Sequence, residues 1–72
     1  MLIMSNTLKK LGDRIREIRE SRKLTQEELA YQADLDYSYV NQIENGRKNP
    51  TVQILEQIAK VLKVTIKDLF SF

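Results

Sequence analysis

Residues 24–46 read LTQEELAYQADLDYSYVNQIENG, and this stretch predicts two short helices joined by a tight turn. Thr25 stands three residues before Glu28, so the threonine hydroxyl can accept a hydrogen bond from the Glu28 backbone N–H while the Glu28 carboxylate accepts one from the Thr25 N–H. This capping box marks the start of the first helix. The apolar face of that helix is formed by Leu29, Ala30 and Ala33. Because these side chains are too few to form a core alone, we expect the helix to pack against its neighbours.

The turn and the second helix follow directly. Asp34 can take the left-handed conformation that turns the chain, and Asp36 can cap a new helix over about residues 37–45. The inward side of this helix, with the residue just before it, consists of Leu35, Val40 and Ile43. The opposite side presents Ser38, Asn41 and Gln42, and Tyr37 projects from the helix tip.

The outer face of this second helix carries hydrogen-bonding side chains without formal charge. Such groups suit the donor and acceptor pattern that base edges display in the major groove of DNA. A helix face that is merely solvated more often carries lysine and glutamate, although a polar surface helix that contacts nothing remains an alternative. We therefore predict a helix-turn-helix over about residues 25–45, in which the second helix reads DNA.

The composition argues against several other classes of protein. The 72 residues are expected to form one domain, residues 1–72, and a chain of this length buries only about 60–65% of its unfolded surface. Cysteine and histidine are absent, so we expect no disulfide, no metal site and no cofactor. Ser38 has no histidine base and the carboxylates are scattered, which argues against an enzyme. No ligand or effector domain is visible, so no small-molecule ligand is expected.

Charge and hydropathy indicate where the protein works. No apolar run approaches the roughly 18 residues of a membrane-spanning helix, and residues 1–4 are too short for a secretory signal. We expect a soluble cytoplasmic protein without membrane contact. The net charge is only +2, but seven of the 12 basic residues lie in residues 9–23, where acidic residues partly cancel them. Attraction to phosphate should therefore be moderate and salt-sensitive.

The segment before residue 24 predicts an amphipathic helix over about residues 7–22. Its apolar stripe, at steps of three and four, consists of Leu8, Leu11, Ile15 and Ile18. Gly12 lies beside the stripe and costs helix propensity. The missing side chain therefore points to the close approach of another helix or of a phosphate.

The segment after the helix-turn-helix predicts two more helices. Gly46 is typical of the residue after a helix end, and Pro50 followed by Thr51 starts a fourth helix that runs to about residue 62. The inward stripe of this helix is expected to contain Val52, Leu55, Ile58, Ala59 and Leu62. Thr65 and Asp68 form another capping pattern, for a short fifth helix that contains Ile66, Leu69 and Phe70. We predict a compact five-helix all-α bundle.

At this point the sequence resembles a known family. Residues 11–70, LGDRIREIRESRKLTQEELAYQADLDYSYVNQIENGRKNPTVQILEQIAKVLKVTIKDLF, are similar to the Cro/CI-type helix-turn-helix domain, or XRE family, whose fold is the lambda-repressor-like DNA-binding domain. The shared elements are the arginine-rich leading helix, LTQEELA, IENG, NPT and the closing LF. The run of residues 35–51 with the terminal LF is most similar to controller proteins of restriction-modification systems and to small phage or chromosomal repressors. The match does not choose between these two groups.

The resemblance implies a homodimer that binds paired half-sites in double-stranded DNA. The candidate base contacts are Tyr37, Ser38 and Gln42, together with Asn41, which faces the groove wall. Tyr37 stands where the controller group often carries arginine, so the operator should differ from those of that group. Asp34 stands where the family most often has glycine, and it can adopt the same turn at modest cost.

Phosphate contacts are expected on both sides of the reading helix. By analogy with the family, Gln26, at the positive end of a helix dipole, and Asn45 should contact phosphates, and the alternative for each is an ordinary helix-end residue. Tyr39 either contacts a phosphate or packs against a neighbour. The loop residues expected to follow the phosphate backbone, unless they only add solubility, are Arg47 and Lys48, flanked by Lys9, Lys10 and Arg14.

Two structural roles complete the prediction. The resemblance implies an ion pair between Arg19 and Glu44 that orients the reading helix. The candidates for a dimer interface are Ile54, Val61, Ile66, Phe70 and Phe72, and the alternative is that the fifth helix folds back over the fourth. We predict a sequence-specific, homodimeric transcriptional regulator on a pseudo-palindromic operator. The alternative function is a protein-interaction module, for example an antitoxin, with the same fold.

Overall fold

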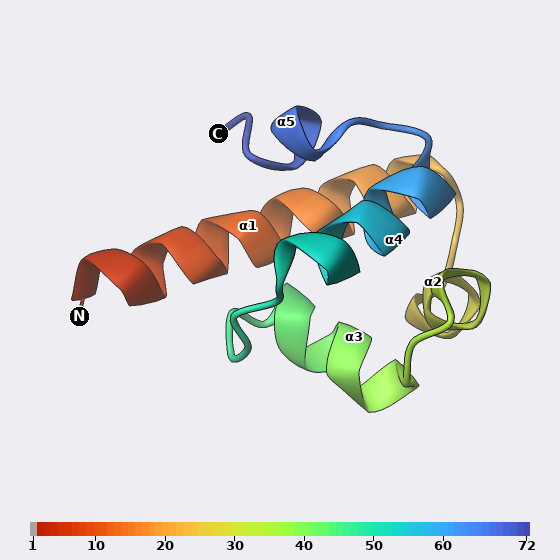
Figure 1. The fold of residues 1–72 in the computed structure, drawn as a ribbon, viewed down its shortest axis with the longest axis horizontal. Coiled ribbons are helices and arrows are strands. Elements are labelled where there is room, and N and C mark those ends of the chain that lie inside the picture. The colour runs from red at the N-terminus through yellow and green to blue at the C-terminus, as the bar shows by residue number, and fades with distance from the viewer. Residues whose placement is uncertain (1) are drawn as a thin grey trace.

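Five helices follow one another in the computed structural model, which describes residues 2–72, with side chains from residue 6 onward. They are α1 (Leu2–Ser21), α2 (Gln26–Ala33), α3 (Tyr37–Glu44), α4 (Val52–Leu62) and α5 (Ile66–Leu69), and residues 2–72 contain no strand. The long α1 crosses the whole molecule, with α4 in front of it, α2 and α3 below and α5 above (Figure 1). The predicted all-α architecture of five helices is therefore confirmed.

Three of the predicted N-terminal caps are present. The Thr25 hydroxyl accepts from the Glu28 N–H at 3.0 Å, and the Glu28 carboxylate accepts from the Thr25 N–H at 2.8 Å. Thr65 and Asp68 form the same reciprocal box at the start of α5, and the Thr65 backbone N–H that donates to the carboxylate lowers the pKa of Asp68. The Thr51 hydroxyl accepts from a backbone N–H in the first turn of α4. Local hydrogen bonds thus define where α2, α4 and α5 begin.

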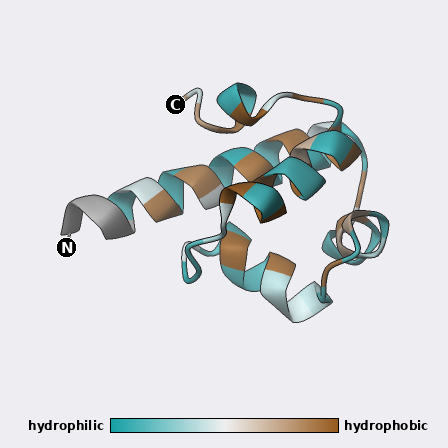
Figure 2. Cartoon of the chain, in the orientation of Figure 1, coloured by the Kyte–Doolittle hydropathy of each residue, from teal (hydrophilic) through white to brown (hydrophobic). Residues whose placement is uncertain are grey.

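One apolar core joins the helices. Its fully buried apolar side chains include Ile15, Leu29, Ile43, Ile58, Leu62 and Leu69. Burying such a side chain stabilises the fold by about 1.5–3 kcal/mol relative to leaving it in water. Helix α3 packs against α1 and α2, α2 against α4, and α5 against both α4 and α1. Helix α3 alternates apolar and polar segments (Figure 2), and its buried apolar residues are Val40 and Ile43. None of the helices in the described part of the chain combines the length and the apolar character of a membrane-crossing segment.

The structure corrects three details of the predicted helices. Helix α1 begins at Leu2 rather than near residue 7, because no glycine or proline interrupts the chain upstream of its apolar stripe. Val52 is not part of the inward stripe of α4: it is the first residue of that helix, beyond the reach of the core, and is 64% exposed. Helix α5 ends at Leu69, so Phe70 is its C-cap rather than a helical residue.

Glycine is required where α1 meets the end of α3. A Cβ atom at Gly12 would lie 2.5 Å from the carbonyl oxygens of both Ile43 and Glu44, so the close approach at Gly12 is that of a helix. Gly46 follows α3 with a φ of +74°, and a Cβ there would lie 2.9 Å from the Lys9 Cα. The Arg47 N–H donates to the Gln42 carbonyl and the Gly46 N–H to the Ile43 carbonyl, which is the Schellman arrangement.

Candidate nucleic-acid interface

The turn between α2 and α3 takes the form that the sequence predicts, with one difference. Asp34 has a φ of 60° in the left-handed region, and its N–H donates to carbonyls in the last turn of α2. The Leu35 N–H donates to the Ala30 carbonyl at 2.8 Å, which closes the turn. Asp36 is the N-cap residue of α3, but its side chain makes no capping hydrogen bond, so the expected cap is present in position only.

The outer face of α3 is less exposed than the sequence pattern implies. Tyr37 is 50% exposed and Ser38 is exposed, so both stand in solvent at the N-terminal turn of the helix. Asn41 and Gln42 are only half-buried. The Asn41 amide donates to the Gln26 side-chain oxygen at 3.0 Å, because the start of α2 lies alongside α3. The candidate base contacts therefore divide into an exposed pair and a half-buried pair.

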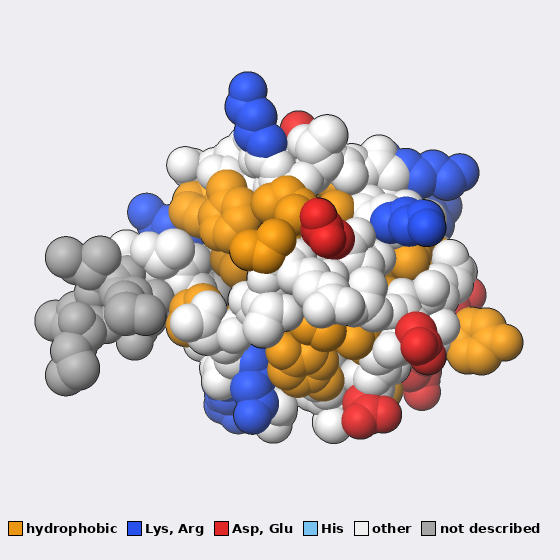
Figure 3. Space-filling view, viewed as in Figure 1, with side chains coloured by type: hydrophobic (Ala, Val, Ile, Leu, Met, Phe, Trp, Pro, Cys, Tyr) orange, Lys and Arg blue, Asp and Glu red, His pale blue; other side chains and the backbone are white. Residues whose placement is uncertain are grey.

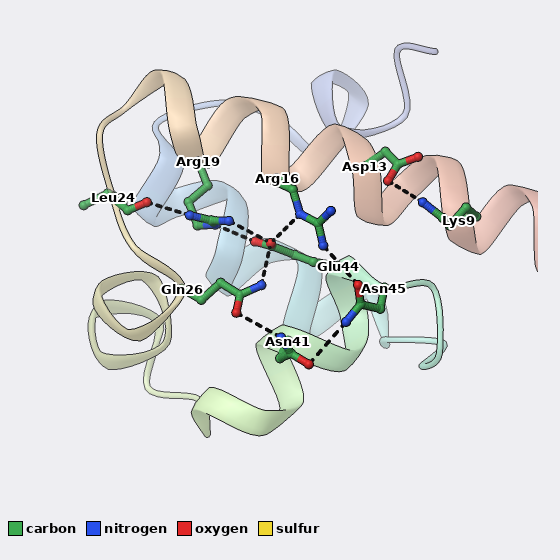
Figure 4. A network of polar contacts seen from close by, with 9 residues as sticks. All are labelled: Lys9, Asp13, Arg16, Arg19, Leu24, Gln26, Asn41, Glu44 and Asn45. Atoms are coloured by element: carbon green, nitrogen blue, oxygen red, sulfur yellow. Dashed lines mark hydrogen bonds and ion pairs between the residues drawn. The ribbon is translucent and has the colours of Figure 1, made fainter.

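A buried carboxylate fixes α3 to α1 and α2. Glu44 is completely buried, and its two oxygens accept from Arg19 Nε at 2.7 Å and from Arg19 Nη2 at 3.0 Å. Arg16 Nε and Gln26 Nε2 also donate to Glu44 Oε1, at 3.3 and 2.9 Å (Figure 4). The hydrogen bond to Glu44 raises the pKa of Arg19, and a further donor bond of 2.7 Å reaches the Leu24 carbonyl. The structure thus brings together Arg19 and Glu44, the two residues expected to pair.

Gln26 and Asn45, the candidate phosphate contacts, lie at the ends of adjacent helices and already hold protein partners. Gln26 is the first residue of α2 and bridges Glu44 and Asn41 through its amide. Asn45 is the exposed C-cap of α3; its oxygen accepts from Arg16 Nη2 at 3.1 Å and its amide donates to Asn41 at 3.2 Å. Any phosphate contact must use the remaining hydrogen-bonding capacity of these amides or their backbone N–H groups.

Two basic residues project from the loop that follows α3. Arg47 and Lys48 are exposed, and the packing of Gly46 on Lys9 places this loop against α1. The Lys9 ammonium pairs with Asp13 at 2.7 Å. Arg14, which was expected to flank the loop, donates to the Asp68 carbonyl on α5 at 2.9 Å.

The α2–α3 turn borders a hollow that the sequence did not predict. Its volume is about 420 Å³, and Tyr31 and Tyr39 stand on its rim with the turn residues Asp34 and Asp36. Tyr39 is half-buried against the core, which favours its packing role over phosphate contact. Tyr31 is 87% exposed.

The candidate dimer residues are not equally available. Ile54, Val61 and Ile66 are partly buried against the core, so the flank of α4 is less free than predicted. Phe70 and Phe72 are 42% and 55% exposed, and their ring centroids lie 6.2 Å apart. Phe70 also borders an apolar hollow of about 200 Å³. Hydrophobic side chains gather between the C-terminal segment and the start of α4 (Figure 3).

Two short helices joined by a three-residue turn, the second with an exposed uncharged N-terminal end, define a helix-turn-helix DNA-binding domain. Residues 15–69 match the HTH_3 family, described as helix-turn-helix. The chain is 39% identical over 71 residues to control protein C.BamHI of Bacillus amyloliquefaciens, which covers 96% of this chain and 88% of that protein. The chain therefore belongs to this family, the XRE family of transcriptional regulators, which bind double-stranded DNA and are not enzymes.

Solved structures agree with this membership. The restriction-modification controller protein C.AhdI from Aeromonas hydrophila superposes with a TM-score of 0.86 at 38% identity, over 88% of this chain and 96% of that one. SinR, described as a master regulator for biofilm formation and solved in complex with DNA, superposes with a TM-score of 0.80 at 35% identity, over 85% of this chain and 98% of that one. The resemblance to controller proteins is thus confirmed at the level of the family and its fold.

Proposed function

We propose that this protein is a sequence-specific regulator that binds a pseudo-palindromic operator as a homodimer, with α3 in the major groove. The observation that carries the proposal is the exposed, uncharged N-terminal turn of α3, which holds Tyr37 and Ser38. In helix-turn-helix domains the N-terminal residues of the second helix contact base edges. Gln42, one turn further along, and Asn41 complete the proposed reading face.

Phosphate contacts on either side of α3 would orient the domain on DNA. We assign them to Gln26 at the start of α2, to Asn45 at the end of α3, and to the exposed Arg47 and Lys48 in the next loop. Contacts to phosphate fix the register of a protein on the duplex but carry little sequence information. Tyr39 is assigned to packing because it is half-buried against the core.

Arg47→Ala should weaken binding to every DNA sequence by a similar factor. Binding sites are first selected from random duplex DNA, and affinities for a selected duplex and for mixed fragments are then measured by fluorescence anisotropy across a salt series. The wild type should prefer the selected duplex and bind it with a steep salt dependence. Because one phosphate contact contributes about one unit to the slope of log K against log salt, the variant should flatten that slope by about one unit.

Lys67→Ala is the matched control, since Lys67 is an exposed cation on α5. It should leave both affinities within about twofold, because an exposed charge outside the binding face contributes little. A wild-type protein that selects no sequence and shows no salt dependence would contradict the proposed function. That result would favour the protein-interaction module instead.

A second copy of the chain is the proposed partner of the apolar surface formed by Phe70 and Phe72, whose rings lie 6.2 Å apart. Both side chains are exposed. A two-fold dimer would use the same patch on both subunits. Pairing of this kind places two reading helices about 34 Å apart, one turn of DNA, which explains the expected pseudo-palindrome. The partly buried Ile54, Val61 and Ile66 would border the contact.

Phe70→Ser should weaken self-association about 10- to 100-fold, because full burial of an aromatic side chain contributes about 1.5–3 kcal/mol, each Phe70 is 42% exposed before association, and the dimer contains two of them. Sedimentation equilibrium at micromolar concentration measures this effect. Tyr31→Ser is the control, since it removes an exposed aromatic ring from α2. A wild-type protein that is monomeric at these concentrations would refute the dimer.

The cellular role follows from the kind of relative that the chain matches over most of its length. C.BamHI and C.AhdI are a control protein and a restriction-modification controller protein. We therefore propose that this chain acts in the cytoplasm as one DNA-binding domain that controls the genes of such a system. Helices α4 and α5 would supply its dimer contacts.

A further inference from the structure

Five side chains at the side of the reading face that borders α1 and α2 form a closed ring of hydrogen bonds. Arg16 Nη2 donates to Asn45 Oδ1 at 3.1 Å, and Asn45 Nδ2 donates to Asn41 Oδ1 at 3.2 Å. Asn41 Nδ2 donates to Gln26 Oε1 at 3.0 Å, and Gln26 Nε2 donates to Glu44 Oε1 at 2.9 Å. Arg16 Nε closes the ring on Glu44 Oε1 at 3.3 Å (Figure 4). The ring links α1, α2, α3 and the C-cap of α3.

The two charged members give this ring a direction. A guanidinium can only donate hydrogen bonds, and an ionised carboxylate can only accept them. Because Arg16 donates to Asn45, the Asn45 amide must present its oxygen to α1 and its NH₂ to Asn41. For the same reason, Asn41 must present its oxygen to Asn45 and its NH₂ to Gln26, and Gln26 must present its oxygen to Asn41 and its NH₂ to Glu44. Rotation of any one amide by 180° would place two donors or two acceptors face to face.

We propose that Arg16 is a positioning residue that fixes which hydrogen-bonding groups Gln26, Asn41 and Asn45 offer to DNA. Arg16 need not touch DNA for this role. Each amide uses one N–H and one oxygen lone pair in the ring and keeps one of each for a ligand. The inference rests on the proposed function, since it assigns the remaining groups to base edges and phosphates.

A fixed orientation has consequences for affinity and for specificity. An asparagine amide recognises adenine by pairing both its donor and its acceptor, so only one orientation of the amide matches a given base. An Asn45 amide that turned its oxygen outward would face the negative phosphate with an acceptor. Side chains that are ordered before binding also lose less conformational entropy in the complex. Arg16 therefore influences three amides although it donates directly to only one of them, Asn45.

The Arg16→Met variant tests the ring without DNA. In NMR spectra of ¹⁵N-labelled protein, the side-chain NH₂ signals of Gln26, Asn41 and Asn45 report the rate of hydrogen exchange at each amide. In the wild type these signals should be well separated and protected, and in Arg16→Met the exchange at Asn45 and Asn41 should become about tenfold faster or more, as expected for loss of a charged hydrogen bond. Arg22→Met is the matched control, because Arg22 directly follows α1 and donates to a different group, the Leu62 carbonyl.

Asn45→Asp provides a second variant on an exposed residue. A carboxylate at this position can still accept from Arg16 but cannot donate to Asn41. The rate of hydrogen exchange at the Asn41 amide should therefore rise, although Arg16 itself is not substituted. Circular dichroism melting curves of all variants establish that the fold is intact. Unchanged amide exchange in both variants would overturn the proposal.

The DNA experiment separates this inference from the proposed function. With the duplex selected above, Arg16→Met should lower the preference for selected over mixed DNA about tenfold, a loss within the range of one base contact, while Arg22→Met keeps it. Faster amide exchange with an unchanged preference would overturn the role in specificity. If the wild type selects no DNA at all, the proposed function fails, although the exchange data would still show whether the ring exists.

Discussion

Glu44→Ala is expected to lower the melting temperature by about 12–40 °C. The carboxylate is fully buried and accepts four hydrogen bonds, two from Arg19, one from Arg16 and one from Gln26. Its removal leaves the buried Arg19 guanidinium without a counter-charge, and breaking such a pair costs about 3–5 kcal/mol. In a domain of this length, each kcal/mol shifts the melting temperature by about 4–8 °C. Thermal melts followed by circular dichroism measure the loss.

Two further variants test whether the loss of stability comes from the buried charge of Arg19 that remains unpaired. Glu17→Ala removes an exposed carboxylate that pairs with Arg14, and should change the free energy of unfolding by less than about 0.5 kcal/mol. Arg19→Met combined with Glu44→Leu removes both charges and keeps apolar volume, so the double variant should be more stable than Glu44→Ala alone. An unchanged melt of Glu44→Ala would refute the stabilising role of the pair.

The parts of this structure that sequence alone predicted are those set by residues close together in the chain. The capping boxes at Thr25 and Thr65 join groups three positions apart, and the left-handed turn at Asp34 depends on one residue. The pairing of Arg19 with Glu44 crosses helices, and it was reached through the family resemblance. Periodicity gave the apolar stripes because an α-helix repeats every 3.6 residues.

The remaining features depend on how the helices pack, and hydrophobic periodicity in the sequence does not reveal which helices lie side by side. Val52 fits the α4 stripe, but its side chain lies outside the core at the first turn. Asn41 fits a solvent-facing position, yet the adjacent start of α2 partly covers it and supplies Gln26 as a partner. In the sequence, Arg16 stands out only as one of the basic residues between residues 9 and 23. Its spacing of three from Arg19 places both on one side of α1, and that was the available signal.

The charges of α1 show the same limit on sequence reasoning. The sequence suggests a basic cluster available for phosphate, but in the structure Arg14, Arg16, Arg19 and Arg22 each donate to another part of the protein. These arginines connect α1, and the turn that directly follows it, to α3, α5 and the C-terminal end of α4. We therefore propose that attraction to DNA depends more on Arg47 and Lys48, which are exposed beyond α3, than on these arginines. This is why net charge alone describes the interface poorly.

Gly12→Ala is expected to destabilise the protein by about 1–3 kcal/mol and to weaken binding to the selected duplex, although alanine is the better helix former. Helix propensity alone would stabilise α1 by about 1 kcal/mol. The new methyl group, however, would lie 2.5 Å from the Ile43 and Glu44 carbonyl oxygens. These are backbone atoms at the end of α3, so they cannot move aside without shifting the reading helix. The clash should therefore outweigh propensity and displace α3 from α1.

The Gly12→Ala prediction separates the two reasons for a glycine at this position. Melting curves and anisotropy on the selected duplex should both change, because the same contact supports the fold and orients α3. Glu20→Ala, an exposed change on the same helix, should alter neither by a comparable amount. A variant that melts like the wild type but binds DNA poorly would instead mean that the glycine makes room for a phosphate. Since the nearest atoms belong to α3, we expect both measurements to fall together.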